Sequence, residues 1–405
     1  MACDASAPRF GMSLLGLFEK PYVDPERAVG IVHQAAHQEL ALRAAREAVV
    51  VLKNDQNVLP LKKTVRSMAV IGPNADEPHN QLGDYVPATI PQHVVTVLEG
   101  IRQSVPAGTK VTHVRGCDVV GAEPNEIAQA RAAAAAADVA IVVVGENERR
   151  MPGKTATNGE GFDAATLELT GLQEDLVKAV QSTGTPTVVV LINGRPLAVR
   201  WIAEHIPAIV EAWLPGEKGG QAVAEVLFGD VNPSGRLSVT VPRHVGQLPV
   251  YYNAKKSKRY WLQEGWGQPY VDLDPKPLFP FGFGLSYTRF DYSDLKVGAR
   301  EISPDASIEV SLTVRNAGDR FGQEVVQLYL EDVVSSVSTP VKELKGFAKV
   351  GLKPGEATTC SFRLTPDDLA LFNANLERVV EPGQFRVLVG ASSEDIRLKG
   401  EFWVK

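Results

Sequence analysis

The stretch VAIVVV, residues 139–144, decides how the first half of this chain folds. All six residues are apolar, and five of them are valine or isoleucine. A run of this kind, without alternating polar residues, is typical of a strand that is covered on both faces in a parallel sheet. It therefore predicts a central strand with helices on either side of the sheet.

Similar apolar strands alternate with helical stretches along the first half of the chain. The expected strands are 68–71, 110–114, 187–192 and 208–213, and the expected helices are 35–53, 94–104, 126–137, 172–180 and 219–228. In the first helix, Leu40, Ala44 and Ala48 recur at helical spacing. This alternation predicts an α/β sandwich, which is a mostly parallel sheet with helices on both faces.

The pattern changes near Phe290 to an alternation of apolar and polar residues with period two. The expected strands there are 308–314, 324–330, 358–364 and 385–389, with turn signals such as NAGDRFG and LKPGE between them. About seven short strands over this length are typical of an all-β sandwich. The paired cysteines and core tryptophan of antibody domains are lacking, which favours a fibronectin III-like sandwich.

These changes in composition divide the chain into four expected regions. They are a linker remnant at 1–34, the α/β sandwich domain at 35–242, an irregular wrapping linker at 243–289, and the fibronectin III-like domain at 290–405. The third region is rich in proline, glycine and aromatic residues, which is typical of a segment that runs over other domains.

Composition excludes several classes of function. A net charge of −6 gives no attraction to nucleic acid or to an anionic membrane. No apolar run of about 18 residues is present to span a bilayer. The three cysteines are widely spaced and the seven histidines never form HExxH, so neither a disulfide framework nor a metal site is expected. Residues 1–12 lack the features of a signal peptide, and the compartment stays unknown.

The loop after Val144 is the strongest candidate for a functional site. Ligands of open parallel sheets bind beyond the carboxyl ends of the strands, and this loop runs about 25 residues before Leu172. Loops of that length inside a compact domain are usually functional or disordered. Within it, Glu160 stands between two glycines, which lets the backbone approach another surface while one carboxyl projects into a cleft.

A series of phrases in this chain resembles the second half of glycoside hydrolase family 3 enzymes, the β-glucosidases and β-xylosidases. The phrases include AVIGPNA (69–75), GDYVP (83–87), VVVGENE (142–148), NGEGFDAATLEL (158–169), INGRPLA (192–198), WLPGEKGG (213–220) and FPFGFGLSYTRF (279–290). The tail from 325 to 356 is similar to their fibronectin III-like domain. The resemblance covers about residues 14–405 in unbroken order.

The resemblance implies a catalytic role for the long loop. In the family, a barrel supplies an aspartate nucleophile and a loop of an (α/β)6 sandwich supplies the general acid/base glutamate, with no metal or organic cofactor. Glu160 matches that glutamate, although GEGFDA stands here where the family has GEGYDR, so that Ala164 replaces the usual arginine. Glu146, directly after the central strand, is the alternative acid, and its other interpretation is a residue that orders the loop.

Further residues are weighed as substrate contacts or as structure. Expected to bind substrate are Asp84, Tyr85, Lys154 and Asn158, with turn structure as the alternative for the first two. Expected to be structural are Asp163, Asn193, Arg195 and Trp213, and a solvated charged turn is expected at Glu148, Arg149 and Arg150. Two tryptophans in irregular sequence, Trp261 and Trp266, stay open as sugar-stacking residues.

The resemblance also implies that something is absent in front of this chain. LGLFEKPYVDPERA (15–28) resembles the family's linker after the barrel, and only a dozen or so residues precede it. The expected partners are therefore a β-linked oligosaccharide or glucoside and a barrel that carries the nucleophile, on a separate chain or a lost segment. Homodimerisation through the uncovered face is a further expectation. Family members are often periplasmic or secreted.

Two other functions remain as alternatives. One is a non-catalytic carbohydrate-binding or interaction module derived from such an enzyme. The other is a nucleotide-binding α/β protein, which is disfavoured because neither GxGxxG nor GxxxxGK[ST] occurs.

Overall fold

The computed structural model describes residues 11–86, 90–122, 126–147, 156–255 and 270–405. The chain divides into two compact units, 1–41 and 42–405. Lys154, Glu148, Arg149, Arg150, Trp261 and Trp266 lie outside the described residues.

The first unit contains helix α2 (Pro25–Ile31), whose start follows from its sequence. Asp24 caps it by accepting a hydrogen bond from the Glu26 amide (3.0 Å), and Pro25 occupies the first turn, where no amide donor is needed. No residue of α2 is buried. Large apolar side chains in this unit are exposed, including Leu15, Tyr22 and Val23.

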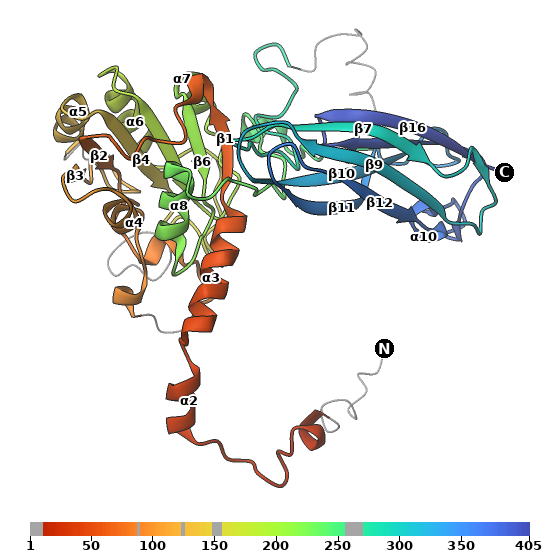
Figure 1. Cartoon of the computed structure of the whole chain (residues 1–405), viewed down its shortest axis with the longest axis horizontal. Helices are drawn as coiled ribbons and strands as arrows, with labels where there is room; N and C mark the ends of the chain where they lie inside the picture. The colour runs from red at the N-terminus through yellow and green to blue at the C-terminus, as the bar shows by residue number, and fades with distance from the viewer. Residues whose placement is uncertain (1–10, 87–89, 123–125, 148–155, 256–269) are drawn as a thin grey trace. The chain divides into compact units, whose positions relative to one another are not determined.

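The second unit begins inside helix α3 (Ala35–Ala48) and continues into a six-stranded sheet (Figure 1). The strand order is β1-β6-β5-β4-β2-β3. The bounds are β1 (Val50–Asn54), β2 (Ser67–Ile71), β3 (Lys110–Val114), β4 (Val139–Gly145), β5 (Thr187–Ile192) and β6 (Ala208–Glu211). Strands β2 to β6 pair in parallel, while β1 lies antiparallel to β6 at the edge.

The expected helix at 35–53 is wrong in its last part. The helix ends at Ala48, and Val50–Asn54 forms β1. Three successive valines, Val49 to Val51, are fully buried. Their branched side chains lose less freedom in a strand than in a helix, and the open edge of β6 supplies hydrogen-bond partners.

Alternate residues of each strand face two separate apolar cores, as expected for a sheet that is covered on both sides. Helices α4 (Val97–Ser104) and α8 (Gly219–Phe228) contribute to the core that contains Ile141 and Val143. The other core contains Val142 and Val144 together with residues of α5 (Ile127–Ala135), α6 (Gln173–Gln181) and α7 (Arg200–His205). The predicted α/β sandwich is confirmed, and α7 is an addition to the predicted helices.

Short 3₁₀ turns complete this region, at η1 (Asp55–Asn57), η2 (His79–Gln81), η3 (Pro91–His93) and η4 (Val245–Gln247). The residues between α8 and β7 contact both halves of the second unit. The Leu285 amide donates to the Val51 carbonyl (2.9 Å), and the Gln327 side chain donates to the Gly282 carbonyl (3.0 Å).

The C-terminal part contains a five-stranded sheet, β11-β10-β15-β16-β8, and a three-stranded sheet, β12-β9-β7. Their bounds are β7 (Phe290–Val297), β8 (Glu301–Ile302), β9 (Ile308–Asn316), β10 (Gly322–Asp332), β11 (Glu343–Leu352), β12 (Ala357–Leu364), β15 (Gly383–Gly390) and β16 (Ile396–Val404), with α10 (Pro366–Leu369) and a hairpin of β13 (Leu371–Phe372) and β14 (Arg378–Val379). One core, which includes Val310, Leu328 and Phe402, joins both sheets. The predicted all-β sandwich is confirmed.

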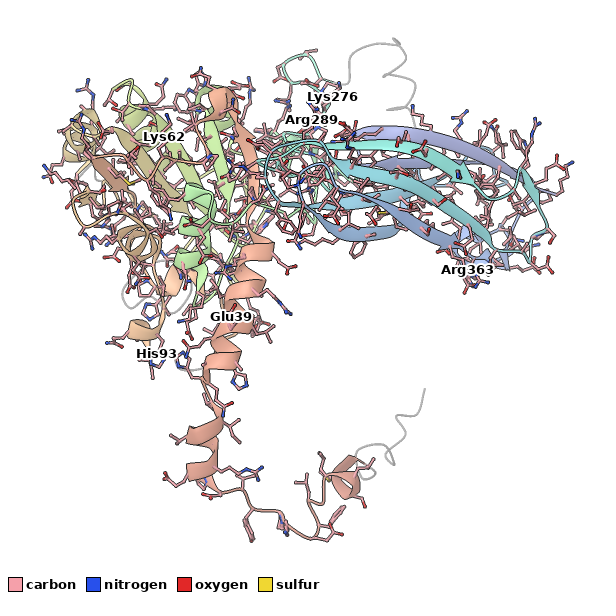
Figure 2. All side chains as sticks on the ribbon, viewed as in Figure 1. Glu39, Lys62, His93, Lys276, Arg289 and Arg363 are labelled. Carbon is pink, nitrogen blue, oxygen red and sulfur yellow. The ribbon has the colours of Figure 1, made fainter. Side chains whose placement is uncertain are left out.

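Strand β12 illustrates the period-two pattern on which that prediction was based. Cys360 and Leu364 are buried, whereas Ser361 and Arg363 are exposed. The Arg363 side chain points away from the ribbon (Figure 2).

Within the described residues, no helix is both long and apolar enough to cross a bilayer.

Candidate active site

The candidate site lies at the sheet edge where the parallel strands end. Strand β4 leads into Glu146, β5 leads into Asn193 and Arg195, and β6 ends at Glu211. Strands β4 and β5 approach so closely here that a β-carbon at Gly145 (φ 145°) would lie 1.9 Å from the Ile192 carbonyl oxygen. Polar residues that are far apart in sequence therefore meet at one edge.

Glu146 is buried, with 5% of its surface exposed, and its carboxylate is fully engaged. It accepts hydrogen bonds from the amides of Gly194 (2.8 Å) and Arg195 (3.1 Å). It also forms a charge-assisted hydrogen bond with the Arg195 guanidinium. Paired and hydrogen-bonded charges of this kind tolerate burial.

Arg195 connects this anchor to the long loop. Besides Glu146, its guanidinium donates to the carbonyl oxygens of Thr157 and Phe162. These two carbonyls stand on either side of Glu160 in the sequence. One side chain therefore fixes both flanks of the segment that carries Glu160.

Glu160 itself is exposed and is contacted by residues of the loop after β2. The Glu160 backbone amide donates to the Asp84 carboxylate (3.0 Å), and the Tyr85 hydroxyl donates to the Glu160 carboxylate (2.6 Å). Gly159 and Gly161 adopt φ values of 113° and 80°, which side-chain-bearing residues rarely adopt. The structure therefore brings together Glu160, Asp84 and Tyr85, three residues that the sequence singled out.

Asn158 lies deeper than Glu160, with 6% of its surface exposed. Its side chain lies beside Gly194, 3.5 Å from the point where a β-carbon would be. Its amide nitrogen is buried without a hydrogen-bond partner among the described residues.

Asp163 is exposed and lines a cavity of about 270 Å³ together with Ala164, Phe162 and Arg195.

Glu211 is a buried carboxyl that the sequence analysis did not single out. Burial raises its pKa to about 8, the nearby Glu146 carboxylate adds to this, and hydrogen bonds from Trp213 and Asn193 oppose it. The Trp213 amide donates at 2.8 Å and the Asn193 side chain at 3.3 Å. A signal was present, because Glu211 is a lone charge in the otherwise apolar run 208–213.

Asparagine side chains complete the sheet edge. The Asn74 side chain donates to the Glu146 carbonyl (3.0 Å), and Asn80 donates to the Asn74 side chain (2.7 Å). Trp213, expected in the core, is partly buried against the core on the α5/α6 face. Across the described residues, no group of three or more metal-ligating side chains is suited to hold a metal ion.

Comparison with known proteins identifies two sequence families in the chain. Residues 49–287 match the glycosyl hydrolase family 3 C-terminal domain, and residues 324–393 match the fibronectin type III-like domain.

Individual relatives are similar over most of this chain. A beta-xylosidase of Formosa agariphila is 44% identical over 368 residues, which cover 90% of this chain and 49% of that protein. A periplasmic beta-glucosidase of Salmonella typhimurium is 38% identical, with 96% and 53% covered. A crystal structure of beta-glucosidase from Listeria innocua in complex with isofagomine superposes with a TM-score of 0.89 at 35% identity, with 97% and 54% covered. The chain spans about half the length of the relatives it matches.

Proposed function

The chain belongs to glycoside hydrolase family 3, and from this premise we propose that Glu160 is the general acid/base of a retaining β-glycosidase. The substrates are β-D-glucosides or β-D-xylosides, in keeping with the relatives named beta-glucosidase and beta-xylosidase. The observation that carries the proposal is the exposed Glu160 carboxylate, held by Tyr85 at the end of a clamped loop.

In the first step, Glu160 gives its proton to the departing glycosidic oxygen while a nucleophilic carboxylate bonds to the anomeric carbon. In the second step, Glu160 takes a proton from a water whose oxygen displaces that carboxylate. Retaining enzymes hold the two carboxyl groups about 5 to 5.5 Å apart. An exposed carboxyl suits this task, since substrate and water must both reach it.

Glu146 is the weaker candidate for the acid. Its carboxylate accepts three hydrogen bonds, one of them from a guanidinium, and it is buried. Protonating Glu146 would break the ion pair with Arg195. Its arrangement suits the ordering of the loop.

Asp84, Tyr85 and Asn158 are proposed to contact the substrate. Tyr85 is 81% exposed and already touches Glu160, so its ring and hydroxyl lie where a sugar would approach the acid. The unsatisfied amide nitrogen of Asn158 would gain from a sugar hydroxyl if the loop shifted on binding. For Lys154, which lies outside the described residues, the same role stays a prediction.

The nucleophile is proposed to come from a barrel domain that is not part of these residues. The support is that the relatives are about twice as long as the matched region. Exposed apolar side chains in the first unit, such as Leu15, Phe18 and Tyr22, would gain from burial against such a domain.

Without a barrel, we propose that the chain dimerises through apolar surface. A monomer in sedimentation velocity runs at low and high salt would contradict this.

The test is release of nitrophenol from aryl β-glucoside and β-xyloside by the 405-residue chain, alone and with a separately produced family 3 barrel. We expect turnover only in the mixture, and a much lower steady-state rate with Glu160→Gln, because the glutamine cannot take a proton from the attacking water in the second step. Turnover by the chain alone, lost in the same variant, would show that the nucleophile is within this chain. Sugar binding by the chain without turnover in the mixture would favour the non-catalytic binding module.

A location outside the cytoplasm is proposed as well, because one relative is named a periplasmic beta-glucosidase. Cell fractionation of the source organism checks it, and recovery of the protein with cytoplasmic markers would contradict it.

A further inference from the structure

We propose that Arg195 is a positioning residue, which holds the loop so that Glu160 meets the glycosidic oxygen in the correct geometry. This inference rests on the proposed acid/base role of Glu160. Arg195 touches no reacting atom in the arrangement described, and acts only through the loop.

The first step of the argument is where the guanidinium contacts fall. Within the part of the chain that the structure describes, its acceptors are the Glu146 carboxylate and the carbonyls of Thr157 and Phe162. Thr157 lies three residues before Glu160 and Phe162 two residues after it. Fixing both points leaves only a short bend, with Gly159 and Gly161 in it, to set the direction of the Glu160 side chain.

The second step is that the guanidinium is itself anchored to rigid structure. Glu146 directly follows β4, is buried, and accepts the amides of Gly194 and Arg195. Its own carbonyl accepts from Asn74 (3.0 Å), so the anchor is tied to the strand end on a second side. The loop is therefore positioned from β4 and β5, in accord with the need for a functional group to rest on rigid elements.

The third step is that the residue type matches the task. A guanidinium is planar and offers five donors in a fixed fork, whereas an ammonium is a single point charge on a flexible stem. The three acceptors lie at the end of β4 and on both flanks of Glu160, a spread that suits a rigid planar fork. Among the described residues, Asp84 and Tyr85 also contact Glu160 at the loop tip, and Tyr85 is exposed.

Hydrogen–deuterium exchange on the 405-residue chain tests this without any turnover. Three loop amides report on order, since those of Thr157, Glu160 and Phe162 all have acceptors. In Arg195→Met we expect exchange in peptides over 156–166 to rise at least about tenfold, while β5 stays protected. Unchanged exchange in the loop would overturn the proposal, and so would faster exchange throughout the sheet, since that marks a general structural role.

Two further variants keep the result interpretable. Arg200→Met is the matched control, because Arg200 pairs with Glu204 on the surface of α7 and should leave the loop unchanged when it is replaced. Arg195→Lys keeps the charge and is expected to restore part of the protection. If Arg195→Met fails to fold, Arg195→Lys carries the test, and wild-type protection in it would overturn the need for the fork.

Leaving-group dependence separates this inference from the proposed function. A good leaving group needs no acid, whereas a poor one does. In the mixture with a barrel, Glu160→Gln should slow poor leaving groups selectively, and Arg195→Met should show the same pattern, with a loss of about 10²-fold. No selectivity in Glu160→Gln would overturn the acid role. Selectivity in Glu160→Gln and none in Arg195→Met would overturn the positioning role alone.

Discussion

Glu146 and Glu160 stand 14 residues apart on one loop, and the structure treats them in opposite ways. Glu146 is buried at the sheet edge, with two backbone amides and a guanidinium around it. Glu160 is exposed at the loop tip, where its carboxylate accepts from a tyrosine hydroxyl. The comparison suggests a division of tasks, in which the buried carboxylate gives the loop a fixed shape and the exposed one stays available for proton transfer.

The largest expected effect separates the two carboxylates by activity. Glu160→Gln should lower turnover of poor leaving groups by about 10² to 10⁴-fold in the chain-plus-barrel mixture, the usual contribution of general acid catalysis. Its free energy of unfolding should change by less than about 0.5 kcal/mol, because the side chain is exposed. Kinetics with a pair of leaving groups and urea unfolding check the two halves. A large loss of stability would show that Glu160, too, is structural.

The second prediction concerns the contribution of Glu146 to stability. Glu146→Ala should lower the free energy of unfolding by about 2 to 4 kcal/mol, since it leaves Arg195 and two amides without their acceptor. Urea unfolding measures this, with Glu204→Ala on the surface of α7 as the control. If both variants lose equally little stability, the buried carboxylate is not an anchor.

The fold was predictable from sequence to the extent that apolar runs decide it. The strand at 187–192 and the helix at 219–228 have the expected bounds. The pattern instead predicts helix for residues 50–53, because Val51 continues the helical spacing of α3. Tertiary structure decided the outcome, since an open sheet edge gave these valines both burial and hydrogen bonds.

The candidate site was predictable only in part, for a related reason. Glu160 stood out because it lies between two glycines in a long loop after a strand, whereas Asp84 and Tyr85 stood out because GDYVP resembles a phrase of the family. The structure brings the three residues together. The role of Arg195 was not visible, because its acceptors are two backbone carbonyls and a distant carboxylate. A contact with a carbonyl leaves no trace in side-chain identity, so only the fold reveals it.

The third prediction concerns Glu211, the second buried carboxyl at this edge of the sheet. Its pKa of about 8 lies above the usual value of 4.5, so the folded chain holds a proton that the unfolded chain has released between those values. This group therefore makes the chain less stable as pH rises from about 4.5 to 8, by up to about 1.4 kcal/mol per pH unit. Above pH 8 its contribution no longer changes.

Glu211→Gln mimics the protonated carboxyl and should remove this slope. Unfolding in urea at about pH 5, 6, 7 and 8 measures the difference between the variant and the parent chain. Asp138, a carboxyl at the opposite end of β4 whose pKa is lowered by hydrogen bonds from the amides of Arg66 and Ser67, provides the contrast. An Asp138→Asn variant should leave the slope across the same pH range in place. Parallel curves for the parent chain and Glu211→Gln would show that Glu211 is ionised when folded.

The smallest expected effect tests how far the loop tip depends on its outer contact. Tyr85→Phe removes the hydroxyl that donates to Glu160 and keeps the ring. An intramolecular hydrogen bond contributes about 0.5 to 1.5 kcal/mol, and an exposed one lies at the low end, so turnover should fall by less than about tenfold and the free energy of unfolding by about 0.5 kcal/mol. Exchange in the loop should also stay near the parent value, because Arg195 still holds both flanks of Glu160. If Tyr85→Phe lowered turnover as much as Arg195→Met does, the contact with Tyr85 would be needed to position Glu160, and Arg195 alone would be insufficient.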